Sequence, residues 1–524
     1  MEGIALLLGA AVVGHAAARV LGLPPVPFLL LSGILLSQTG LVTTTLLEDA
    51  LVLGVAILLF VTGIELNPAR TRAQRDAALR VGVVQFFALA LLGFASALAL
   101  GFDVVGALFI GLALTASSTL VVARLLQQRG HAFEPFARLV LGVLLLQDLL
   151  VILLIPLVTL FPAGIAAAGA GLAGLTVMLV LTAAAARWVA PQLAHFEHDD
   201  ESVLLATMAL LFAFIGLSAR FGLPLVVGAF LAGVAVSRFP ASGVVRSQLG
   251  SIGDFFTAIF FPSLGALLTG LSGSELARAF VLALLVVLAT PPLVAWIAER
   301  AGFSARPALE AGLLLSQTSE LSLVIGLYAM LEGHISSSLF TIIALVTALT
   351  MIATPFLTAD RVVWRLLRFH PVRRAPAETA PLSDHVVLLG SGSTGLPLVE
   401  TLLSAGTPVV VVDDDPTIVE RLREADVLCV RGDASDEVVL RRVNARGARI
   451  IISTIRRPRD NRRLLEVARN IPVLCRVFED EDARWVERMG GRPVVYSQAA
   501  AEGLLRWFDE ADAELERRLA ERAR

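Results

Sequence analysis

Lysine is absent from this sequence: all 42 basic residues in the chain of 524 are arginine. That absence excludes any mechanism that needs a lysine Schiff base, a lysine general base or the lysine of a P-loop. Cysteine is almost absent too, because Cys429 and Cys475 are the only two. Two cysteines provide neither a disulfide framework nor a cysteine-rich metal site, and we expect no metal centre.

Charge is also scarce. Only 17% of the residues are charged and 56% are hydrophobic, with a mean hydropathy of +0.80, whereas soluble proteins carry about 25% charged residues. A net charge of −3 gives no indication of a nucleic-acid partner. The scarcity is confined to residues 1–358, which hold 15 arginines and 18 acidic residues, while 359–524 hold 27 of each. This contrast predicts a membrane region followed by a soluble domain.

Long apolar runs fill the first region. Most approach the roughly 20 residues that a helix needs to cross the hydrocarbon core. We assign 13 segments, near 3–21, 25–40, 46–66, 79–100, 103–126, 136–160, 163–190, 201–219, 223–237, 254–272, 276–298, 307–331 and 336–358. With the N-terminus outside, only Arg220 and Arg278 fall on the outer side. Because cytoplasmic loops carry the arginine excess, we predict a multi-pass protein embedded in lipid, with a cytoplasmic C-terminal domain.

Two carboxylates lie within the apolar segments. Asp148 stands in LLLQDLLVI near the middle of the sixth segment, and Glu320 stands in LLLSQTSELSLVI within the twelfth. Intramembrane ionisable groups are costly and are functional candidates by default. A carboxylate without a cationic partner is either protonated or bound to a cation, and that alternation is the chemistry of cation/proton exchange. A purely structural, protonated Asp148 and a helix-packing role for Glu320 are the alternatives.

Small polar residues interrupt two of the apolar segments. The fifth contains LALTASSTLVVA, with Thr115, Ser117 and Ser118, and the twelfth contains SQTSE, with Gln317 and Ser319. Hydroxyl groups can satisfy the backbone where a membrane helix unwinds. The two segments are seven apart and therefore cross the membrane in opposite directions. Paired interruptions of this kind indicate an inverted repeat with its ion site near the midplane, although polar helix–helix contacts are the alternative for either stretch alone.

At these residues the membrane region resembles the Kef-type branch of the monovalent cation:proton antiporters. The resemblance rests on LLFVTGIELNPAR, ALTASSTLVVARLL, the Gln–Asp pair in LLLQDLLVI, LPLVVGAFLAGVAVS and SQTSELSLVI. It implies an NhaA-like α-helical fold with inverted repeats, which exchanges a monovalent cation, K⁺ in preference to Na⁺, for H⁺ by alternating access. It assigns ion and proton binding to Asp148, Gln147, Thr115, Ser117 and Ser118. It assigns the helix break or its support to Glu320, Gln317, Ser319 and Glu65.

The sequence departs from these relatives in its eleventh segment, where many of them carry a lysine and Thr290 stands here. Without that lysine only Asp148 carries charge between the two sides, which predicts electroneutral exchange of one cation for one proton. A ligand-gated, channel-like potassium efflux system is the alternative. The resemblance further implies a homodimer in the bacterial inner membrane, with an ancillary regulatory subunit as a further partner.

A glycine motif opens the soluble domain. The stretch HVVLLGSGSTG places Gly390, Gly392 and Gly395 between a strand and a helix, and Asp413 ends the next strand, PVVVVDDD. Glycines allow close approach to phosphates, and an acid at this position bonds a ribose diol. The alternative is an empty Rossmann-like domain that uses the loop structurally.

This domain resembles those that regulate potassium conductance, which implies that Asp433 lies near the adenine. An acid at Asp413 favours NAD(H), AMP or ADP over NADP. We therefore predict a transporter domain at 1–358, a linker at 359–384, a Rossmann-like regulatory domain at 385–497 and a charged helix at 498–524. No substrate-binding half or catalytic His/Lys pair accompanies the Rossmann-like domain, which argues against an oxidoreductase.

Overall fold

A computed structural model describes most of the chain in two compact units. The described residues are 2–40, 44–65, 75–128, 135–160, 165–189, 191, 200–237, 243–268, 272–367, 383–392, 395–455, 458–468 and 470–522. One unit comprises Met1–Ala301 with Ala308–Trp364. The other comprises Gly302–Pro307 with Arg365–Arg524, so a short piece of the membrane region belongs to the same unit as the soluble domain.

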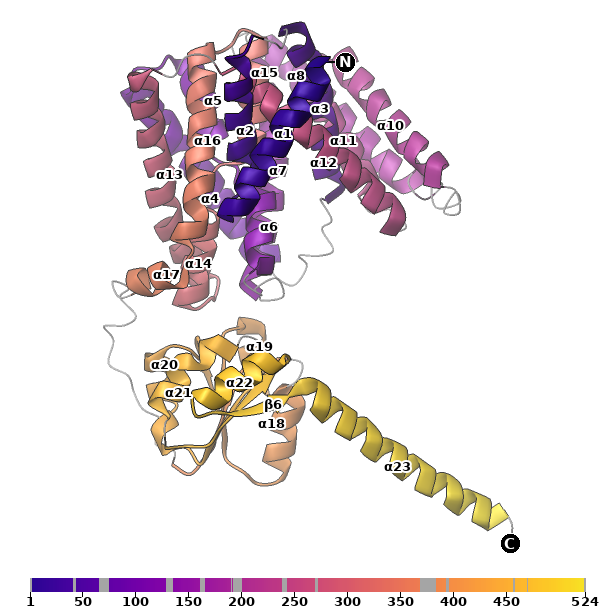
Figure 1. Ribbon diagram of the computed structural model, residues 1–524, viewed down its shortest axis with the longest axis vertical. Coiled ribbons are helices and arrows are strands. Elements are labelled where there is room, and N and C mark those ends of the chain that lie inside the picture. Colours follow the sequence, from indigo (N-terminus) through magenta and orange to yellow (C-terminus); the bar gives the residue numbers. More distant parts are fainter. Residues whose placement is uncertain are drawn as a thin grey trace. The chain divides into compact units, whose positions relative to one another are not determined.

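The first unit is built from helices alone, within the described residues (Figure 1). They are α1 (Glu2–Leu21), α2 (Pro25–Ser37), α3 (Thr44–Glu65), α4 (Arg75–Ala99), α5 (Val104–Ala113), α6 (Thr119–Gln128), α7 (Pro135–Leu160), α8 (Ile165–Ala184), η3 (Ala185–Val189), α10 (Asp200–Arg220), α11 (Leu225–Val236), α12 (Gly243–Ala266), α13 (Gly273–Arg300), α14 (Ala305–Leu314, whose first turn lies in the other unit), α15 (Glu320–Leu331), α16 (Ser337–Leu357) and α17 (Asp360–Leu367, whose last three residues lie in the other unit).

Every predicted apolar segment overlaps one of these helices or a pair of them, although α12 begins at Gly243, well before its predicted segment 254–272. Among the described residues, seven helices are long and apolar enough to cross a membrane unaided. Several others, including α2, α5, α11 and α15, are apolar but shorter. The number of 13 membrane crossings therefore stays a prediction.

Small residues let two of these helices approach each other closely. A Cβ atom on Gly233 of α11 would lie 2.1 Å from the carbonyl oxygen of Phe60 in α3, and one on Gly63 would lie 2.3 Å from that of Phe230. Apolar side chains gain little by leaving lipid, so membrane helices associate through close packing of this kind. This contact holds α3, which ends at Glu65.

Two membrane segments are each split into two short helices. The chain leaves helical geometry between Ala113 and Thr119, and again between Leu314 and Glu320. The Ser118 hydroxyl accepts a hydrogen bond from the Val121 amide at 3.3 Å. The Ser319 hydroxyl likewise accepts one from Leu321 at 3.0 Å. These are helix N-caps, and they satisfy backbone donors that lipid cannot satisfy.

The second unit contains a six-stranded parallel sheet in the order β3-β2-β1-β4-β5-β6. Its strands are β1 (Val386–Leu389), β2 (Val409–Asp413), β3 (Cys429–Arg431), β4 (Ile450–Ser453), β5 (Val473–Val477) and β6 (Arg492–Val495). The helices are α18 (Gly395–Ser404), α19 (Pro416–Glu424), α20 (Glu437–Arg442), α21 (Arg462–Val467), α22 (Asp480–Arg488) and α23 (Tyr496–Arg522), with the short turns η6 (Ala445–Gly447) and η7 (Pro458–Asn461).

The apolar strands explain why this sheet forms. Val387 and Leu389 of β1 pack into a buried cluster on one face, while Val386 and Leu388 pack into another on the opposite face. Strands covered on both faces read as continuous apolar runs, as HVVLL and PVVVV do. The predicted Rossmann-like sheet is confirmed, with the strand order that reverses between β1 and β4.

Two features flank the sheet domain. Within the predicted linker 359–384, Asp360–Leu367 forms α17, and residues 368–382 lie outside the described part of the chain. In the region of the predicted charged helix 498–524, Tyr496–Arg522 forms α23, which extends away from the sheet (Figure 1).

Candidate functional site

The two split segments contact each other through buried hydroxyl groups. Ser117 Oγ donates to the carbonyl oxygen of Leu315 at 2.9 Å. Ser118 Oγ donates to Glu320 Oε1 at 2.7 Å. In the opposite direction, the Ser322 hydroxyl donates to the carbonyl oxygen of Ala113, which ends α5. Three bonds therefore join the break between α5 and α6 to the break between α14 and α15.

Asp148 lies on α7 beside this junction and is 5% exposed. The Thr119 hydroxyl donates to Asp148 Oδ2 over 3.4 Å. The neighbouring Gln147 takes a different role, because its Oε1 accepts the backbone N–H of Ser117 at 3.2 Å. The adjacent residues Gln147 and Asp148 therefore have different roles. The Gln147 side-chain amide holds the backbone of the first break, and the Asp148 carboxylate lines the cavity described next.

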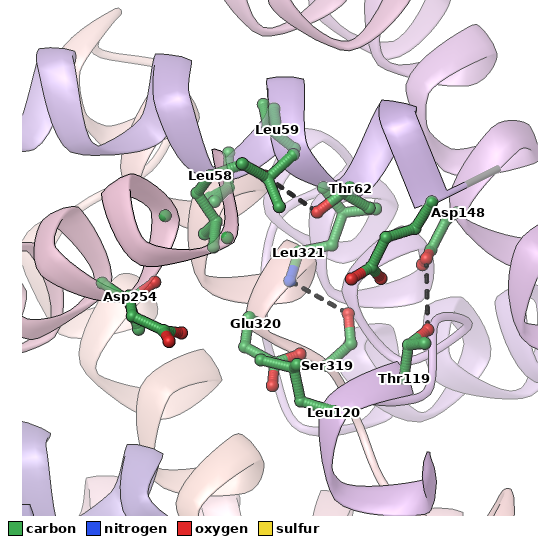
Figure 2. Close-up of a pocket in the computed structure, with 16 residues that line it drawn as sticks. Leu58, Leu59, Thr62, Thr119, Leu120, Asp148, Asp254, Ser319, Glu320 and Leu321 are labelled. Carbon is green, nitrogen blue, oxygen red and sulfur yellow. Dashed lines mark hydrogen bonds between the residues drawn. The ribbon is translucent and has the colours of Figure 1, made fainter. Parts of the chain in front are cut away.

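A cavity of about 150 Å³ opens at Asp148. Figure 2 shows Asp148 and Thr119 on one side of it, Asp254 on the opposite side, and Ser319 and Glu320 between them. Glu65, at the end of α3, also lines it. Four of the predicted site residues, Asp148, Glu320, Ser319 and Glu65, therefore line the same cavity.

The other predicted residues lie around the breaks and are not among those that line the cavity. Ser117, Ser118 and Gln147 make the bonds described above. The Thr115 hydroxyl donates to the carbonyl oxygen of Leu112 at 2.7 Å, and Gln317 Nε2 donates to that of Leu314 at 3.4 Å. Both side chains satisfy carbonyl groups at the end of a half-helix. Thr115 and Gln317 thus support the breaks rather than line the cavity.

Several residues of this site were not among the predicted site residues. Asp254 of α12 stood at the edge of a predicted segment, and Thr119 was noted only as one of the hydroxyl residues that interrupt the fifth apolar segment. On the far side of the second break, Thr350 Oγ1 accepts the Thr318 amide at 3.1 Å, and the Thr318 hydroxyl donates to Thr347 at 3.0 Å. The one available signal was the spacing of three residues between threonines in LVTALTMIATP.

The charged side chains that line the cavity, among the described residues, are all acidic. Its lining contains four carboxylates and no arginine, within the described residues. Thr119 and Glu320 are the first residues of α6 and α15, so the positive ends of two helix dipoles lie beside Asp148 and Glu320. Half-helix ends aimed at a midplane site are a recurring device of ion transporters.

The glycine loop of the sheet domain has the geometry of a dinucleotide-binding turn. Gly390 follows β1 with φ of +79°, which favours glycine. A Cβ atom on Gly395 would lie 2.6 Å from the carbonyl oxygen of Gly390, so only glycine lets α18 begin here. A Cβ atom on Gly392 would meet nothing within 4 Å, which leaves open space over the loop.

Asp413 ends β2 and faces this loop. Its Oδ2 accepts the amide and the hydroxyl of Ser391 at 2.7 and 2.8 Å, and its Oδ1 accepts the Asp415 amide at 2.9 Å. Asp433, after β3, accepts the amide and hydroxyl of Ser435 on Oδ1. All the predicted nucleotide-binding residues thus lie at or beside the carboxyl edge of the sheet, where ligands of such folds bind.

Crossed half-helices beside a buried carboxylate, followed by a Rossmann-like domain, define a membrane transporter with a soluble domain. Residues 4–359 match the model of the sodium/hydrogen exchanger transmembrane family, and residues 386–497 match the TrkA-N domain. The chain belongs to the sodium/hydrogen exchanger family. It is a cation:proton antiporter with a C-terminal TrkA-N domain, not an enzyme.

Two curated relatives illustrate the similarity. The chain is 29% identical over 482 residues to the glutathione-regulated potassium-efflux system protein KefC of Klebsiella pneumoniae, covering 88% of this chain and 76% of that protein. It is 27% identical over 523 residues to the chloroplastic K⁺ efflux antiporter 1 of Arabidopsis thaliana, covering 94% of this chain and 43% of that one. A solved TrkA-N domain of the Escherichia coli inner membrane protein ybaL is 26% identical, covers 24% of this chain and 98% of its own, and has a TM-score of 0.24.

Proposed function

We propose that the protein exchanges K⁺, in preference to Na⁺, for H⁺ by alternating access at Asp148. The observation that supports this most directly is the cavity in which a buried carboxylate meets two half-helix N-termini. Asp148 binds either a proton or a dehydrated cation, and the Thr119 hydroxyl and the Glu320 carboxyl add oxygen ligands, which monovalent and other hard cations prefer.

The absence of lysine determines the proposed ratio of cations to protons in the exchange. A cation that leaves Asp148 is replaced by one proton, so the charge of the site is the same in both transported states. The dipoles of α6 and α15 supply a fixed positive potential that does not titrate. We therefore infer electroneutral exchange, one cation for one proton.

Alternating access needs a group that moves as a body. The hydroxyl bonds from Ser117, Ser118 and Ser322 tie the two breaks together, so both can move past the rest of the helices without separating. In the proposed homodimer, the remaining helices provide the stationary part. We place the protein in the bacterial inner membrane with its N-terminus outside and its TrkA-N domain in the cytoplasm.

The names of the relatives favour K⁺ as the cation, because both are potassium efflux proteins. The second candidate is a ligand-gated, channel-like potassium efflux system, and the name of the Klebsiella protein, a glutathione-regulated potassium-efflux system, supports regulation by a ligand. The hydroxyl hydrogen bonds between the two helix breaks argue for the exchanger. They fill the centre of the site with hydrogen-bonded backbone, whereas a channel filter is an open ring of carbonyl groups.

We further propose that the TrkA-N domain binds NAD(H), AMP or ADP and that this binding regulates exchange. Gly390, Gly392 and Gly395 would admit the phosphates, Asp413 would bond the ribose and Asp433 would lie near the adenine. The geometry that supports this is the positive φ of Gly390, the open space over Gly392 and the acid at the end of β2.

Asp148→Asn tests the exchanger. An amide cannot exchange a proton for a cation at neutral pH, so we expect H⁺ flux driven by a K⁺ gradient in proteoliposomes to fall to the level of empty vesicles. Asp103→Asn is the matched control, because Asp103 caps the N-terminus of α5 and asparagine caps equally well. Unchanged exchange in Asp148→Asn would contradict the proposal.

Two further measurements on the same proteoliposomes distinguish the exchanger from the channel-like efflux system. Replacing K⁺ by Na⁺ should slow the H⁺ flux, and a solid-supported-membrane measurement should show no net charge per turnover. K⁺ flux without H⁺ flux would instead favour the channel-like system.

A further inference from the structure

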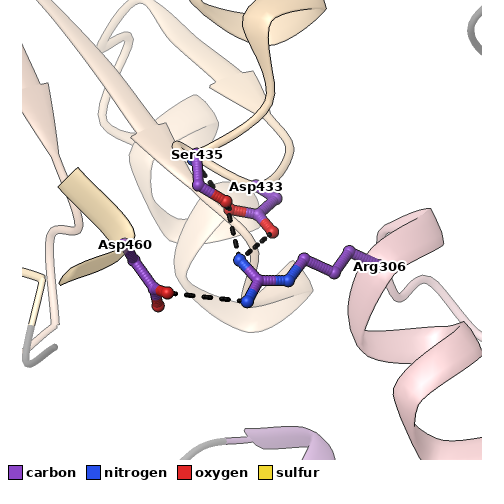
Figure 3. Close-up of polar contacts among 4 residues, drawn as sticks. All are labelled: Arg306, Asp433, Ser435 and Asp460. Atoms are coloured by element: carbon purple, nitrogen blue, oxygen red, sulfur yellow. Dashed lines mark hydrogen bonds and ion pairs between the residues drawn. The ribbon is translucent and has the colours of Figure 1, made fainter. Parts of the chain in front are cut away.

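An arginine from the membrane region belongs to the unit of the Rossmann-like domain. Residues Gly302–Pro307 form one unit with Arg365–Arg524. Within this unit Arg306 is 6% exposed, and its Nη1 donates to Ser435 Oγ at 2.7 Å and lies 3.3 Å from Asp433 Oδ2. Its Nη2 lies 3.5 Å from Asp460 Oδ1. Figure 3 shows the guanidinium between the two carboxylates.

The acceptors of Arg306 stand where a ligand of this fold would bind. Asp433 and Ser435 follow β3, and Asp460 lies in η7, which follows β4. Both loops lie at the carboxyl edge of the parallel sheet. Arg306 and the proposed nucleotide would therefore compete for Asp433.

Arg306 also lies in the first turn of α14. This helix ends at Leu314. The carbonyl oxygen of the next residue, Leu315, accepts a hydrogen bond from the Ser117 hydroxyl, which joins the two helix breaks. One helix of 10 residues therefore joins the arginine to the ion site by covalent continuity. An α-helix transmits displacement because its backbone bonds resist bending.

We propose that Arg306 is the positioning residue through which nucleotide occupancy alters exchange. The inference rests on the proposed nucleotide site and names its regulation. A nucleotide that engages Asp433 removes one acceptor of Arg306 and weakens its hold on the start of α14. Separating a buried arginine from its carboxylates is costly, so the contact has two distinct states instead of a continuum. A ligand shifts such an equilibrium only through its different affinity for the two states, and Asp433 supplies that difference.

The test compares Arg306→Gln with Arg300→Gln in the full-length protein. Arg300 ends α13, and its guanidinium lies 3.9 Å from the centre of the Trp296 ring, so it controls for the loss of one arginine from the same stretch of chain. H⁺/K⁺ exchange in proteoliposomes is measured with and without AMP, ADP or NAD⁺, and nucleotide binding is measured by calorimetry. We expect Arg306→Gln to bind nucleotide while the ratio of exchange rates with and without it falls to unity. Arg300→Gln should keep the wild-type ratio.

A second variant guards against misfolding. Asp460→Asn removes one partner of Arg306 and leaves Asp433, so it should reduce the nucleotide response partially. In the double variant that combines Arg306→Gln with Asp460→Asn, the effect of nucleotide on exchange should be no smaller than in Arg306→Gln alone, since both substitutions remove the same contact. A nucleotide response of wild-type size in Arg306→Gln would overturn the inference, and so would loss of nucleotide binding in that variant.

The failure of the proposed nucleotide site has a different signature. If the wild type binds none of the three nucleotides, that proposal fails while Asp148-dependent exchange remains. The Arg306 contact is then judged on exchange without nucleotide, which Arg306→Gln should change and Arg300→Gln should not. Equal rates in the wild type and both variants would overturn it.

Discussion

Two buried aspartates, one in each unit, have opposite surroundings. Asp148 and Asp413 are almost equally shielded, at 5% and 7% exposed. Asp413 accepts three hydrogen bonds of 2.7 to 2.9 Å, two of them from backbone amides. Asp148 accepts the Thr119 hydroxyl over 3.4 Å and faces a cavity. Burial alone therefore does not define a site.

The difference lies in what each carboxylate needs. A buried charge is stable when donors surround it, as at Asp413, and the donors then fix the loop that carries it. A carboxylate that the protein leaves short of donors is completed by a ligand, and a proton or a cation would serve at Asp148. The first arrangement suits a carboxylate that holds the proposed nucleotide-binding loop in place, and the second suits a transported ion.

The stability of variants tests this comparison most strongly. Asp413→Ala leaves three donors without their acceptor, which should cost about 1–3 kcal/mol of unfolding free energy. Asp148→Asn removes a poorly stabilised buried charge, so its unfolding temperature in detergent should not fall. Thermal unfolding of both full-length variants measures this, with Glu420→Gln on the exposed face of α19 as the control. A larger loss in Asp148→Asn than in Asp413→Ala would reverse the comparison.

An effect of similar size is expected where the two helix breaks meet. Ser118→Ala removes the hydroxyl that donates to Glu320 Oε1 and accepts from Val121, and the loss of one such buried partner costs about 1–3 kcal/mol. We expect the exchange rate to fall about tenfold, since 1.4 kcal/mol corresponds to that factor. Ser96→Ala, in α4, provides a control for a serine within a membrane helix. A wild-type exchange rate in Ser118→Ala would show that the hydrogen bond between the two helix breaks does not position the residues around the cavity.

The smallest effect concerns a buried acid with no donor to stabilise its charged form. Burial raises the pKa of the Cys475 thiol in β5 to about 12. The folded state thus holds this proton more tightly than the unfolded state, so the stabilisation is complete below the unfolded pKa and is lost progressively as pH rises toward 12. With an unfolded pKa of about 8.5, the loss at pH 9 is about 0.8 kcal/mol.

This pH dependence is measurable because few other groups titrate there: the chain has no lysine and only two tyrosines. Denaturant unfolding of the wild type and of Cys475→Ala at pH 7 and pH 9 gives the difference. The alanine variant should lose less stability between the two pH values. An equal loss in both proteins would mean that the thiol is not the group responsible.

Much of the fold was readable from local pattern. Continuous apolar runs predicted the helices, and HVVLLGSGSTG followed by PVVVVDDD predicted the parallel sheet and the placement of Asp413. Asp148 and Glu320 could be identified because a carboxylate in an apolar run is expensive wherever it packs. None of these inferences required knowledge of a distant contact.

The remaining features depend on contacts between distant segments. Ser117 meets Leu315 across 198 residues, and Ser118 meets Glu320 across 202. Asp254 lines the cavity because of where α12 packs, although no local pattern singled it out. Arg306 looked like one of many loop arginines, and its cluster with Asp433 and Asp460 became visible only in the folded domain.

By itself, the sequence indicated which solvent each region occupies and which charges are functional candidates, because the cost of burying an ionisable group depends on its chemistry and its apolar neighbours. It also excluded every role for lysine. The tertiary structure alone decided which polar groups meet, since hydrogen bonds depend on distance and direction to within a fraction of an ångström. For that reason the sequence singled out Asp148, whereas its hydrogen bond from Thr119 and the cavity that it lines became visible only in the fold.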